Sequence, residues 1–398
     1  MPFRLVLPPT DRSPATLPAV EDGDPLEFHR RLPGYAPTQL LRVPELAKRL
    51  GVADVLVKDE ASRLGLPAFK MLGASWATSR AIRREWTGEE VPLDVAAQRD
   101  ALQGSGRRLA AATDGNHGRG VARMAALLGL RCSIFVPAGT ARSRIEDIEG
   151  EGAQVTVVDG SYDDAILRSA EEVGPDTLVV SDTSWPGYTR TPTDVINGYS
   201  TIFREIDETL DRHGMGGPSH AFFQSGVGSF AAAGLGHYRT TSVHRPFGVI
   251  VEPTRANCLM RSAEAGQMSE APGPHQSTMA GLNCGLPSML AWPVVYGWAD
   301  GYLSVDDDLA NEAMRLLAGV GLVAGESGAA SLAALLAIAD SEADRARLDL
   351  DRDSVLLLVN TEGATDPVNY AAQVGETPAT TAGEREARRA RTGTLVLA

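Results

Sequence analysis

The chain has 398 residues, 43% of them hydrophobic, and a formal net charge of −14 at pH 7 with an isoelectric point near 5.0. This length and apolar content are enough to fill the cores of two domains of ordinary size. The acidic balance argues against a surface that binds nucleic acid or an anionic membrane, because such a surface needs clustered basic residues.

No stretch of the sequence approaches the ~18 uninterrupted apolar residues of a membrane-spanning helix. The first residues, MPFRLVLPPTDRSP, lack the charged and apolar regions of a secretion signal, and we expect a cytoplasmic enzyme. Cys132, Cys258 and Cys284 do not have the spacing of zinc ligands, so we expect no metal site. Pairing of Cys258 with Cys284 stays open, although disulfides are rare in the cytosol.

The N-terminal part of the chain is irregular and then turns helical. Residues 1–40 are rich in proline, a helix is predicted over 43–50, and a short apolar strand over 55–57. The apolar spacing over 73–86 is again helical, whereas the charged and glycine-containing segment 88–107 is predicted to be a surface excursion.

Strand and helix patterns then alternate, which is typical of a parallel sheet with right-handed crossovers. The predicted strands are 108–113, 132–136, 154–158 and 177–181, and the predicted helices are 119–128, 142–150 and 163–173.

A second parallel sheet is predicted from strands at 220–224, 247–252 and 355–359, with helices at 194–214, 306–319 and 329–339. The fold class is therefore α/β, with two domains that each contain a mostly parallel sheet flanked by helices. We assign residues 1–75 and 200–398 to a large domain and residues 76–199 to a small one. The Gly/Thr/Arg-rich tail after Gly375 is predicted to be disordered.

Only three lysines occur in the chain, Lys48, Lys58 and Lys70. Lys70 lies in the apolar sequence Ala-Phe-Lys-Met-Leu-Gly, where desolvation is expected to lower its pKa and make the amine a nucleophile able to form a Schiff base. The alternative is a lysine that lays its stem along a helix and keeps its ammonium in water, as we expect of Lys48.

Two glycine-containing turns follow predicted strands. In Thr113-Asp-Gly-Asn-His-Gly118 the glycines allow a flat ligand to approach the backbone, and Asn116 can donate to a ring hydroxyl. The alternative is an ordinary turn that uses Asn and Gly for backbone reasons. His117 is expected to serve packing or a backbone bond.

The second turn, Ser225-Gly-Val-Gly-Ser229, opens a predicted helix, so its amides and the helix N-terminus can bind a phosphate. Glu252, at the end of the next strand, imitates the acidic residue of a dinucleotide-binding fingerprint. A nicotinamide dehydrogenase is therefore a rival interpretation, but it explains neither Lys70 nor the turn at 113–118.

These motifs together resemble the fold-type II pyridoxal-phosphate enzymes, and within that group the diaminopropionate ammonia-lyase family. The resemblance covers roughly residues 35 to 370 in nine blocks, at 58–60, 68–73, 112–122, 181–188, 226–231, 255–259, 280–288, 325–329 and 360–367. Pro67 departs from the family pattern, which has a polar residue such as Asn before the lysine turn.

The resemblance implies that Lys70 binds pyridoxal 5'-phosphate covalently, that Asn116 contacts the ring hydroxyl and that Thr361, or else Asn360, faces the ring nitrogen. The full cofactor-binding set that it implies is Lys70, Phe69, Asn116, Gly226, Val227, Gly228, Ser229 and Thr361. It also implies a homodimer that acts on a small amino acid. Glu326 is expected either near the cofactor ring or at a helix N-terminus.

Asp114 stands where dehydratases and racemases of this fold usually have a serine. A carboxylate is a better proton acceptor than a hydroxyl, so we expect Lys70 to remove the α-proton of one enantiomer and Asp114 that of the other. Asp114 or Asp182 can hold a positively charged β-amino group. The alternative for Asp182 is a turn-capping aspartate; Trp185 and Tyr188 are expected to pack in the same loop.

The sequence thus predicts α,β-elimination of D- or L-2,3-diaminopropionate to pyruvate and two ammonia molecules, with Lys70, Asp114 and Asp182 as catalytic residues. A serine/threonine dehydratase or a β-replacement synthase of the same fold is the second interpretation. A nicotinamide dehydrogenase or a non-catalytic ligand-binding protein is the third.

Overall fold

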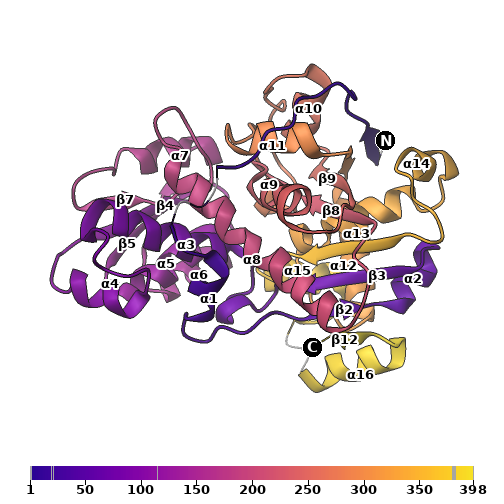
Figure 1. Cartoon of the computed structure of the whole chain (residues 1–398), viewed down its shortest axis with the longest axis horizontal. Helices are drawn as coiled ribbons and strands as arrows, with labels where there is room; N and C mark the ends of the chain where they lie inside the picture. Colours follow the sequence, from indigo (N-terminus) through magenta and orange to yellow (C-terminus); the bar gives the residue numbers. More distant parts are fainter. Residues whose placement is uncertain (1, 19, 21, 114, 379–381, 398) are drawn as a thin grey trace. The chain divides into compact units, whose positions relative to one another are not determined.

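The computed structural model describes residues 2–18, 20, 22–113, 115–378 and 382–397. The chain divides into two compact units (Figure 1). Unit 1 consists of Met1–Leu17, Pro37–Ser62 and Ile202–Ala398, and unit 2 of Pro18–Ala36 and Arg63–Thr201. Within the ranges given above, no helix combines the length and apolar character needed to span a lipid bilayer.

Unit 1 is built on an eight-stranded sheet with the order β1-β10-β9-β8-β11-β3-β2-β12. The strands are β1 (Phe3–Val6), β2 (Leu40–Arg42), β3 (Asp54–Asp59), β8 (His220–Gln224), β9 (Phe247–Pro253), β10 (Gly301–Val305), β11 (Val355–Asn360) and β12 (Leu395–Leu397). The run β10-β9-β8-β11-β3 is parallel, and the outer strands β1, β2 and β12 pair antiparallel.

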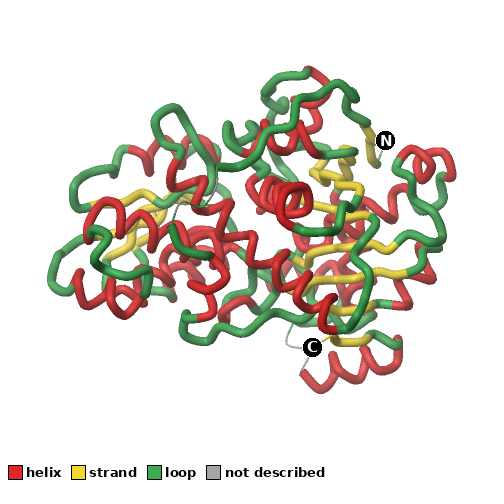
Figure 2. Tube along the Cα trace, viewed as in Figure 1, coloured by secondary structure: helices red, strands yellow, loops and turns green. Residues whose placement is uncertain are grey.

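Some helices of unit 1 pack directly on this sheet and others pack on those helices or lie at its edge (Figure 2). They are α2 (Pro44–Leu50), α9 (Ser229–Gly236), α10 (Cys258–Ala265), α11 (Ala291–Trp298), α12 (Asp307–Gly319), α13 (Glu326–Ile338), α14 (Glu342–Arg347), α15 (Pro367–Val374) and α16 (Ala382–Thr392). Alternate strand residues such as Val249 and Val251 share one core with α2, α12 and α13. This period of two is what places one face of each strand against the helices.

Unit 2 contains a four-stranded, fully parallel sheet with the order β6-β5-β4-β7. Its strands are β4 (Arg108–Ala112), β5 (Arg131–Pro137), β6 (Gln154–Val158) and β7 (Thr177–Val179). Its helices are α1 (Pro25–Arg30), α3 (Lys70–Ile82), α4 (Val95–Leu102), α5 (Asn116–Leu128), α6 (Arg142–Gly150) and α7 (Tyr162–Ala170). The long helix α8 (Arg190–Arg212) begins in unit 2 and ends in unit 1.

The α/β fold class and both parallel sheets are confirmed. The prediction missed the strands β1, β2, β10 and β12, and it missed α4 inside the segment taken for a surface excursion. The expected disorder after Gly375 is wrong for the described part of the tail, where α16 forms and β12 pairs with β2. The compact units group residues 18–36 and 63–75 differently from the predicted domains, and Lys70 lies in unit 2.

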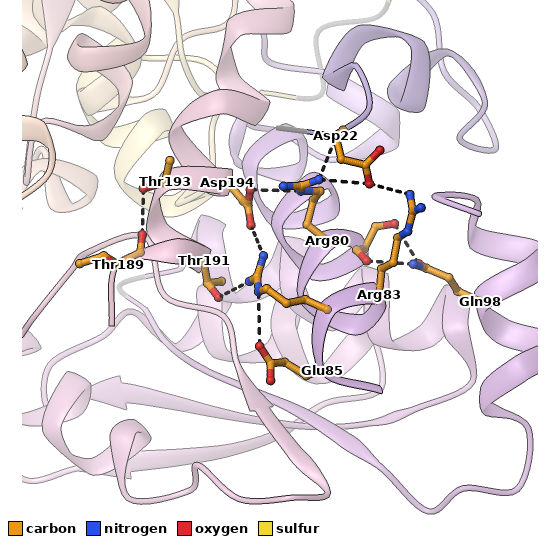
Figure 3. Close-up of polar contacts among 11 residues, drawn as sticks. Asp22, Arg80, Arg83, Glu85, Gln98, Thr189, Thr191, Thr193 and Asp194 are labelled. Carbon is orange, nitrogen blue, oxygen red and sulfur yellow. Dashed lines mark hydrogen bonds and ion pairs between the residues drawn. The ribbon is translucent and has the colours of Figure 1, made fainter. Parts of the chain in front are cut away.

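Ion pairs fix helix α3, which carries Lys70 at its start, and the helical turn that follows it (Arg83–Thr87) to the beginning of α8 (Figure 3). Arg80 Nε lies 3.3 Å from Asp194 Oδ1, and Arg84 Nη1 lies 3.0 Å from Asp194 Oδ2. Arg80 also donates to the backbone oxygen of Asp22 over 2.6 Å. Because the Asp194 carboxylate is only 7% exposed, its two oxygens need these partners.

Glu252 has a structural role at the end of β9. Its fully buried carboxyl group accepts hydrogen bonds of 2.8 Å from the backbone N–H groups of Leu259 and Met260, in the first turn of α10. Burial raises the pKa of Glu252 to about 8, although these hydrogen bonds favour the ionised form. The acid that imitates a ribose-binding residue in the sequence is therefore a helix cap.

We predict that Glu252→Gln changes the pH dependence of folding. In the parent chain the folded state favours the neutral carboxyl of Glu252. Its contribution to the free energy of unfolding is therefore fully present below about pH 4.5 and is lost as the pH rises through about 8. The glutamine stays neutral, so the variant should gain stability relative to the parent between pH 5 and pH 9, by about 4 kcal/mol.

Unfolding curves at a series of pH values measure this gain. Glu270→Gln, at an exposed position, is the matched control and should give a difference independent of pH. A constant offset between Glu252→Gln and the parent would show that Glu252 does not take up a proton on folding.

Candidate active site

The three lysines have distinct environments. Lys48 is exposed, as expected. Lys58 is fully buried in unit 1, where its Nζ lies 2.6 Å from Glu205 Oε2 and donates to the Thr38 carbonyl. Lys70 is between these extremes, with its side chain 19% exposed. It is thus the lysine that combines partial burial with access from outside.

Lys70 is the first residue of α3, whose N-terminal turn is held from two sides. The buried imidazole of His29 contacts the Leu72 carbonyl oxygen at 2.9 Å. A Cβ on Gly73 would lie 2.4 Å from the ring of Tyr199 in α8, so only glycine allows the two helices to pack this closely. Phe69, immediately before Lys70, packs its ring against Tyr199 as well, with 4.7 Å between ring centroids.

The amine of Lys70 contacts a carboxylate that follows strand β7. Lys70 Nζ lies 2.6 Å from Asp182 Oδ2, and the hydroxyl of Tyr162 donates to Asp182 Oδ1 over 3.0 Å. Burial by itself raises the pKa of Asp182, but the charge of Lys70 and the hydrogen bonds from Lys70 and Tyr162 outweigh it and lower the pKa overall. Asp182 is therefore ionised at neutral pH.

The chain around Asp182 is fixed by aromatic residues of the same loop. The Tyr188 hydroxyl donates to the Val179 carbonyl over 2.6 Å and accepts from the Ser181 amide at 3.1 Å. Trp185 stacks on Tyr188 with 4.1 Å between ring centroids. Both aromatic residues thus have the packing role expected of them. The Thr183 amide donates to Ser181 Oγ over 3.3 Å, and the Asp182 carboxylate contacts Lys70 and Tyr162.

The turn between β4 and α5 is organised by Thr113, whose Oγ1 accepts the backbone N–H groups of Gly115 and Gly118 at 2.9 and 3.0 Å. Asp114 lies outside the described residues. Asn116 is the partly exposed first residue of α5. His117 Nε2 lies 2.8 Å from the Val180 carbonyl oxygen, which is the backbone bond expected of it.

Burial lowers the pKa of His117, so its imidazole is neutral at pH 7. Since Nε2 donates to Val180, Nδ1 is an acceptor, and it has no hydrogen-bond partner in the part of the chain that the structure describes. The ring connects α5 to the segment that leads to Asp182, and it brings no positive charge to that carboxylate at neutral pH.

In unit 1 the glycine loop Ser225–Gly228 joins β8 to the N-terminus of α9. Gly228 is the N-cap residue with φ of 98°, a conformation that favours glycine, and it has no side chain to cap the helix. A Cβ on Gly226 would lie 2.7 Å from Cys284 Sγ. The loop therefore keeps its backbone bare at a helix N-terminus, which is the usual construction of a phosphate site.

The two residues that end β11 and follow it differ in how they are used. Asn360 Nδ2 donates to Asp59 Oδ1 at 2.8 Å and to the Val323 carbonyl at 3.0 Å, so its donors are occupied. Thr361 Oγ1 accepts from Gln224 Nε2 over 3.0 Å. The hydroxyl hydrogen of Thr361 enters no hydrogen bond among the described residues, so this side chain can still donate.

Two further predictions, for Glu326 and for the cysteines, receive an outcome. Glu326 is the buried first residue of α13 and accepts a hydrogen bond from Asn369 Nδ2, so it lies at a helix N-terminus. Cys132, Cys258 and Cys284 are buried free thiols, and no disulfide joins Cys258 to Cys284.

Unit 2 therefore brings together Lys70 and Asp182, with Asn116 and His117 at the start of α5, and unit 1 contains the glycine loop and Thr361. Sequence reasoning missed Tyr162. Its position offered a signal, because Tyr162 starts the helix after β6, and the carboxyl ends of parallel strands meet at one edge of a sheet.

Comparisons with known proteins agree on one family. A family model described as "Pyridoxal-phosphate dependent enzyme" matches residues 31–361. The chain is 36% identical to the diaminopropionate ammonia-lyase of Escherichia coli (strain K12) over 88% of this chain and 90% of that protein. It is 37% identical to the Salmonella typhimurium (strain LT2) protein of the same name over 87% and 89%. The crystal structure of the Escherichia coli enzyme in complex with D-serine matches with a TM-score of 0.85, 33% identity and coverage of 94% and 96%.

We predict that Lys70→Met destabilises the cofactor-free protein, because it leaves the buried Asp182 carboxylate without its cation. The expected loss at neutral pH is about 2 to 4 kcal/mol. Since the pKa of Asp182 is lowered in the parent, the ion pair stabilises above pH 3.8 and this contribution is lost as the pH falls through the folded value. The difference should shrink on acidification, as the variant's carboxyl protonates.

Denaturant unfolding at several pH values tests this expectation, with the exposed Lys48→Met as control. If Lys70→Met were as stable as the parent at pH 7, the contact would not be a stabilising ion pair.

Proposed function

Since the chain belongs to the family of pyridoxal-phosphate dependent enzymes, we propose that it is a carbon–nitrogen lyase that converts 2,3-diaminopropionate into pyruvate and two ammonia molecules. The observation that carries this proposal is the contact between the Lys70 amine and the ionised Asp182 carboxylate. The similar proteins of Escherichia coli and Salmonella typhimurium bear the name of this activity and support it.

The residues present fit the cofactor. Lys70 supplies an amine for its aldehyde, with Phe69 beside that amine. The backbone N–H groups of Gly226, Val227, Gly228 and Ser229 suit a phosphate. The two glycines leave this backbone uncovered, and added Cβ atoms there would crowd the loop. When bound, the cofactor supplies an electron sink for negative charge at the substrate α-carbon.

The two polar groups of the cofactor ring, its hydroxyl and its nitrogen, match Asn116 and Thr361. Asn116 would hold the ring hydroxyl. Thr361, rather than Asn360, would donate to the ring nitrogen, because both amide hydrogens of Asn360 are already used and the Thr361 hydroxyl hydrogen is not. A hydroxyl that donates to the nitrogen keeps the ring neutral.

Asp182 accounts for the choice of substrate. The β-amino group of diaminopropionate is a cation until it leaves as ammonia, and a buried carboxylate next to the reactive amine attracts and orients such a cation. Lys70 and Asp114 would take the α-proton of opposite enantiomers. A dehydratase for serine or threonine needs no anion here, because its leaving hydroxyl is neutral.

We also propose that the protein is a cytoplasmic homodimer, as the family resemblance implies. Light scattering on the purified protein tests the dimer, and fractionation of its native cells tests the location.

Incubation of the purified protein with D- and L-diaminopropionate should release pyruvate and ammonia in a ratio of one to two. A visible absorption band should be bleached by borohydride, which fixes the cofactor to Lys70. With three lysines in the chain, peptide mapping locates this attachment directly. Faster turnover of serine or threonine than of diaminopropionate would favour the dehydratase. Absence of the absorption band would exclude both the ammonia-lyase and the dehydratase.

Asp114→Ser should lower kcat/KM for one enantiomer of diaminopropionate by about 100-fold or more, because a hydroxyl is a poor base at neutral pH. Turnover of the other enantiomer, which relies on Lys70, should fall by less than about tenfold. Asp182→Asn is the companion variant and should weaken both enantiomers. Equal losses for both enantiomers in Asp114→Ser would contradict the assignment of two separate bases.

A further inference from the structure

We propose that Tyr162 is a positioning residue that holds the Asp182 carboxylate for the positively charged β-substituent of the substrate, and that it thereby favours a diamino acid over a hydroxy amino acid. This inference rests on the proposed function and extends it to a residue outside the cofactor motifs. It begins from the hydrogen bond between the Tyr162 hydroxyl and Asp182 Oδ1.

The two oxygens of Asp182 have different partners. Oδ1 lies 3.0 Å from the Tyr162 hydroxyl and Oδ2 lies 2.6 Å from Lys70 Nζ. An ionised carboxylate only accepts hydrogen bonds, so the phenol must be the donor. Two donors on separate oxygens fix the rotation of the carboxylate plane, and Tyr162 thereby directs Oδ2 toward the reactive amine.

Tyr162 itself stands on a rigid support. It is the first residue of α7 and follows a reciprocal cap, in which Ser161 and Asp164 each accept a hydrogen bond from the other's backbone N–H. Helix α7 packs against β4 and β5, and its Ala165 belongs to the same buried cluster as Val179 at the end of β7. The segments that carry the phenol and the carboxylate are therefore tied to one sheet.

Under the proposed function, the Lys70 nitrogen would hold the cofactor before the substrate binds and would act as a base once the substrate is bound. It would not stay a fixed donor to Asp182, so Oδ2 would face the substrate while Oδ1 keeps its bond to the phenol. His117, on α5, is neutral at pH 7 because burial lowers its pKa, and it does not replace the lost charge.

A buried carboxylate prefers a cation to a neutral hydroxyl, because the cation adds the attraction of opposite charges to the hydrogen bond that either donor can make. The preference depends on Oδ2 facing the substrate. Loss of the phenol removes the donor that orients Oδ1, so the cost should fall mainly on a substrate with a charged β-group.

Tyr162→Phe tests the proposal, because it removes the hydroxyl and keeps the ring. We expect KM for diaminopropionate to rise about tenfold, while kcat/KM for D- or L-serine changes by less than about threefold. Binding of D- or L-alanine, which has no leaving group and is followed by the shift of the cofactor spectrum, should stay within about twofold.

A second measurement uses the cofactor-free protein. If the phenol acts on Asp182, then Tyr162→Phe should cost nothing once Asp182→Asn is present, and the double variant should unfold within about 1 °C of Asp182→Asn alone. If the shifts in unfolding temperature of Tyr162→Phe and Asp182→Asn simply added in the double variant, the phenol would not act through Asp182.

Tyr302→Phe is the control, since its buried phenol bonds to the Val295 carbonyl in unit 1 and should leave the preference for diaminopropionate over serine unchanged. If Tyr162→Phe lost the same factor in kcat/KM for diaminopropionate and for serine, the role of Tyr162 would be overturned. The proposed function would still stand, because the parent protein would still convert diaminopropionate. A parent that converts serine but not diaminopropionate would instead overturn the proposed function, and this inference with it.

Discussion

A buried carboxylate beside a partly buried amine is the constraint on which unit 2 depends. Asp182 is 5% exposed on its side chain, so its charge is tolerable only while donors meet both oxygens. Those donors come from the starts of α3 and α7, and Asp182 itself follows β7. Two of these segments, those of Tyr162 and Asp182, follow strands β6 and β7 of one parallel sheet, whose carboxyl ends share an edge, and helix α3 brings Lys70 to the same place.

The small number of lysines gains a physical meaning in this setting. Arginine supplies the structural ion pairs of unit 2, and its planar fork lets one side chain serve two partners. Arg119 contacts both Asp147 and Glu151, and Arg80 contacts Asp194 and Asp22. A guanidinium keeps its charge and does not compete with an amine for an aldehyde. Under the proposed function, the framework is thus held by cations that leave the covalent chemistry to Lys70.

The sequence was informative where local pattern and final environment agree. The five central strands of unit 1 are flanked by helices, and most of them have the apolar runs from which β3, β8, β9 and β11 were predicted. The antiparallel strands β2 and β12 have three residues each, too few for a period to show. The composition of α16 predicts disorder, because the partners that hold this helix are distant in the sequence. Arg388 donates to the Ala318 carbonyl, and Arg389 donates to the Gly321 carbonyl. Tyr162 was missed for the same reason, since its importance comes from one contact across 20 residues.

The division of chemistry between the two units bears on how substrate choice is set. Under the proposed function, unit 1 recognises the phosphate and the ring nitrogen, features that belong to the cofactor whatever the substrate. The groups that meet the substrate's own charge and α-proton, Asp182 with Tyr162 behind it and the two proposed bases Lys70 and Asp114, all belong to unit 2. Changes of specificity then need only exchange donors and charges around the Lys70 amine, while the glycine loop and Thr361 stay as they are. A carboxylate that already pairs with an amine in the free protein is suited to this purpose, because the substrate's ammonium would replace a contact of the same charge.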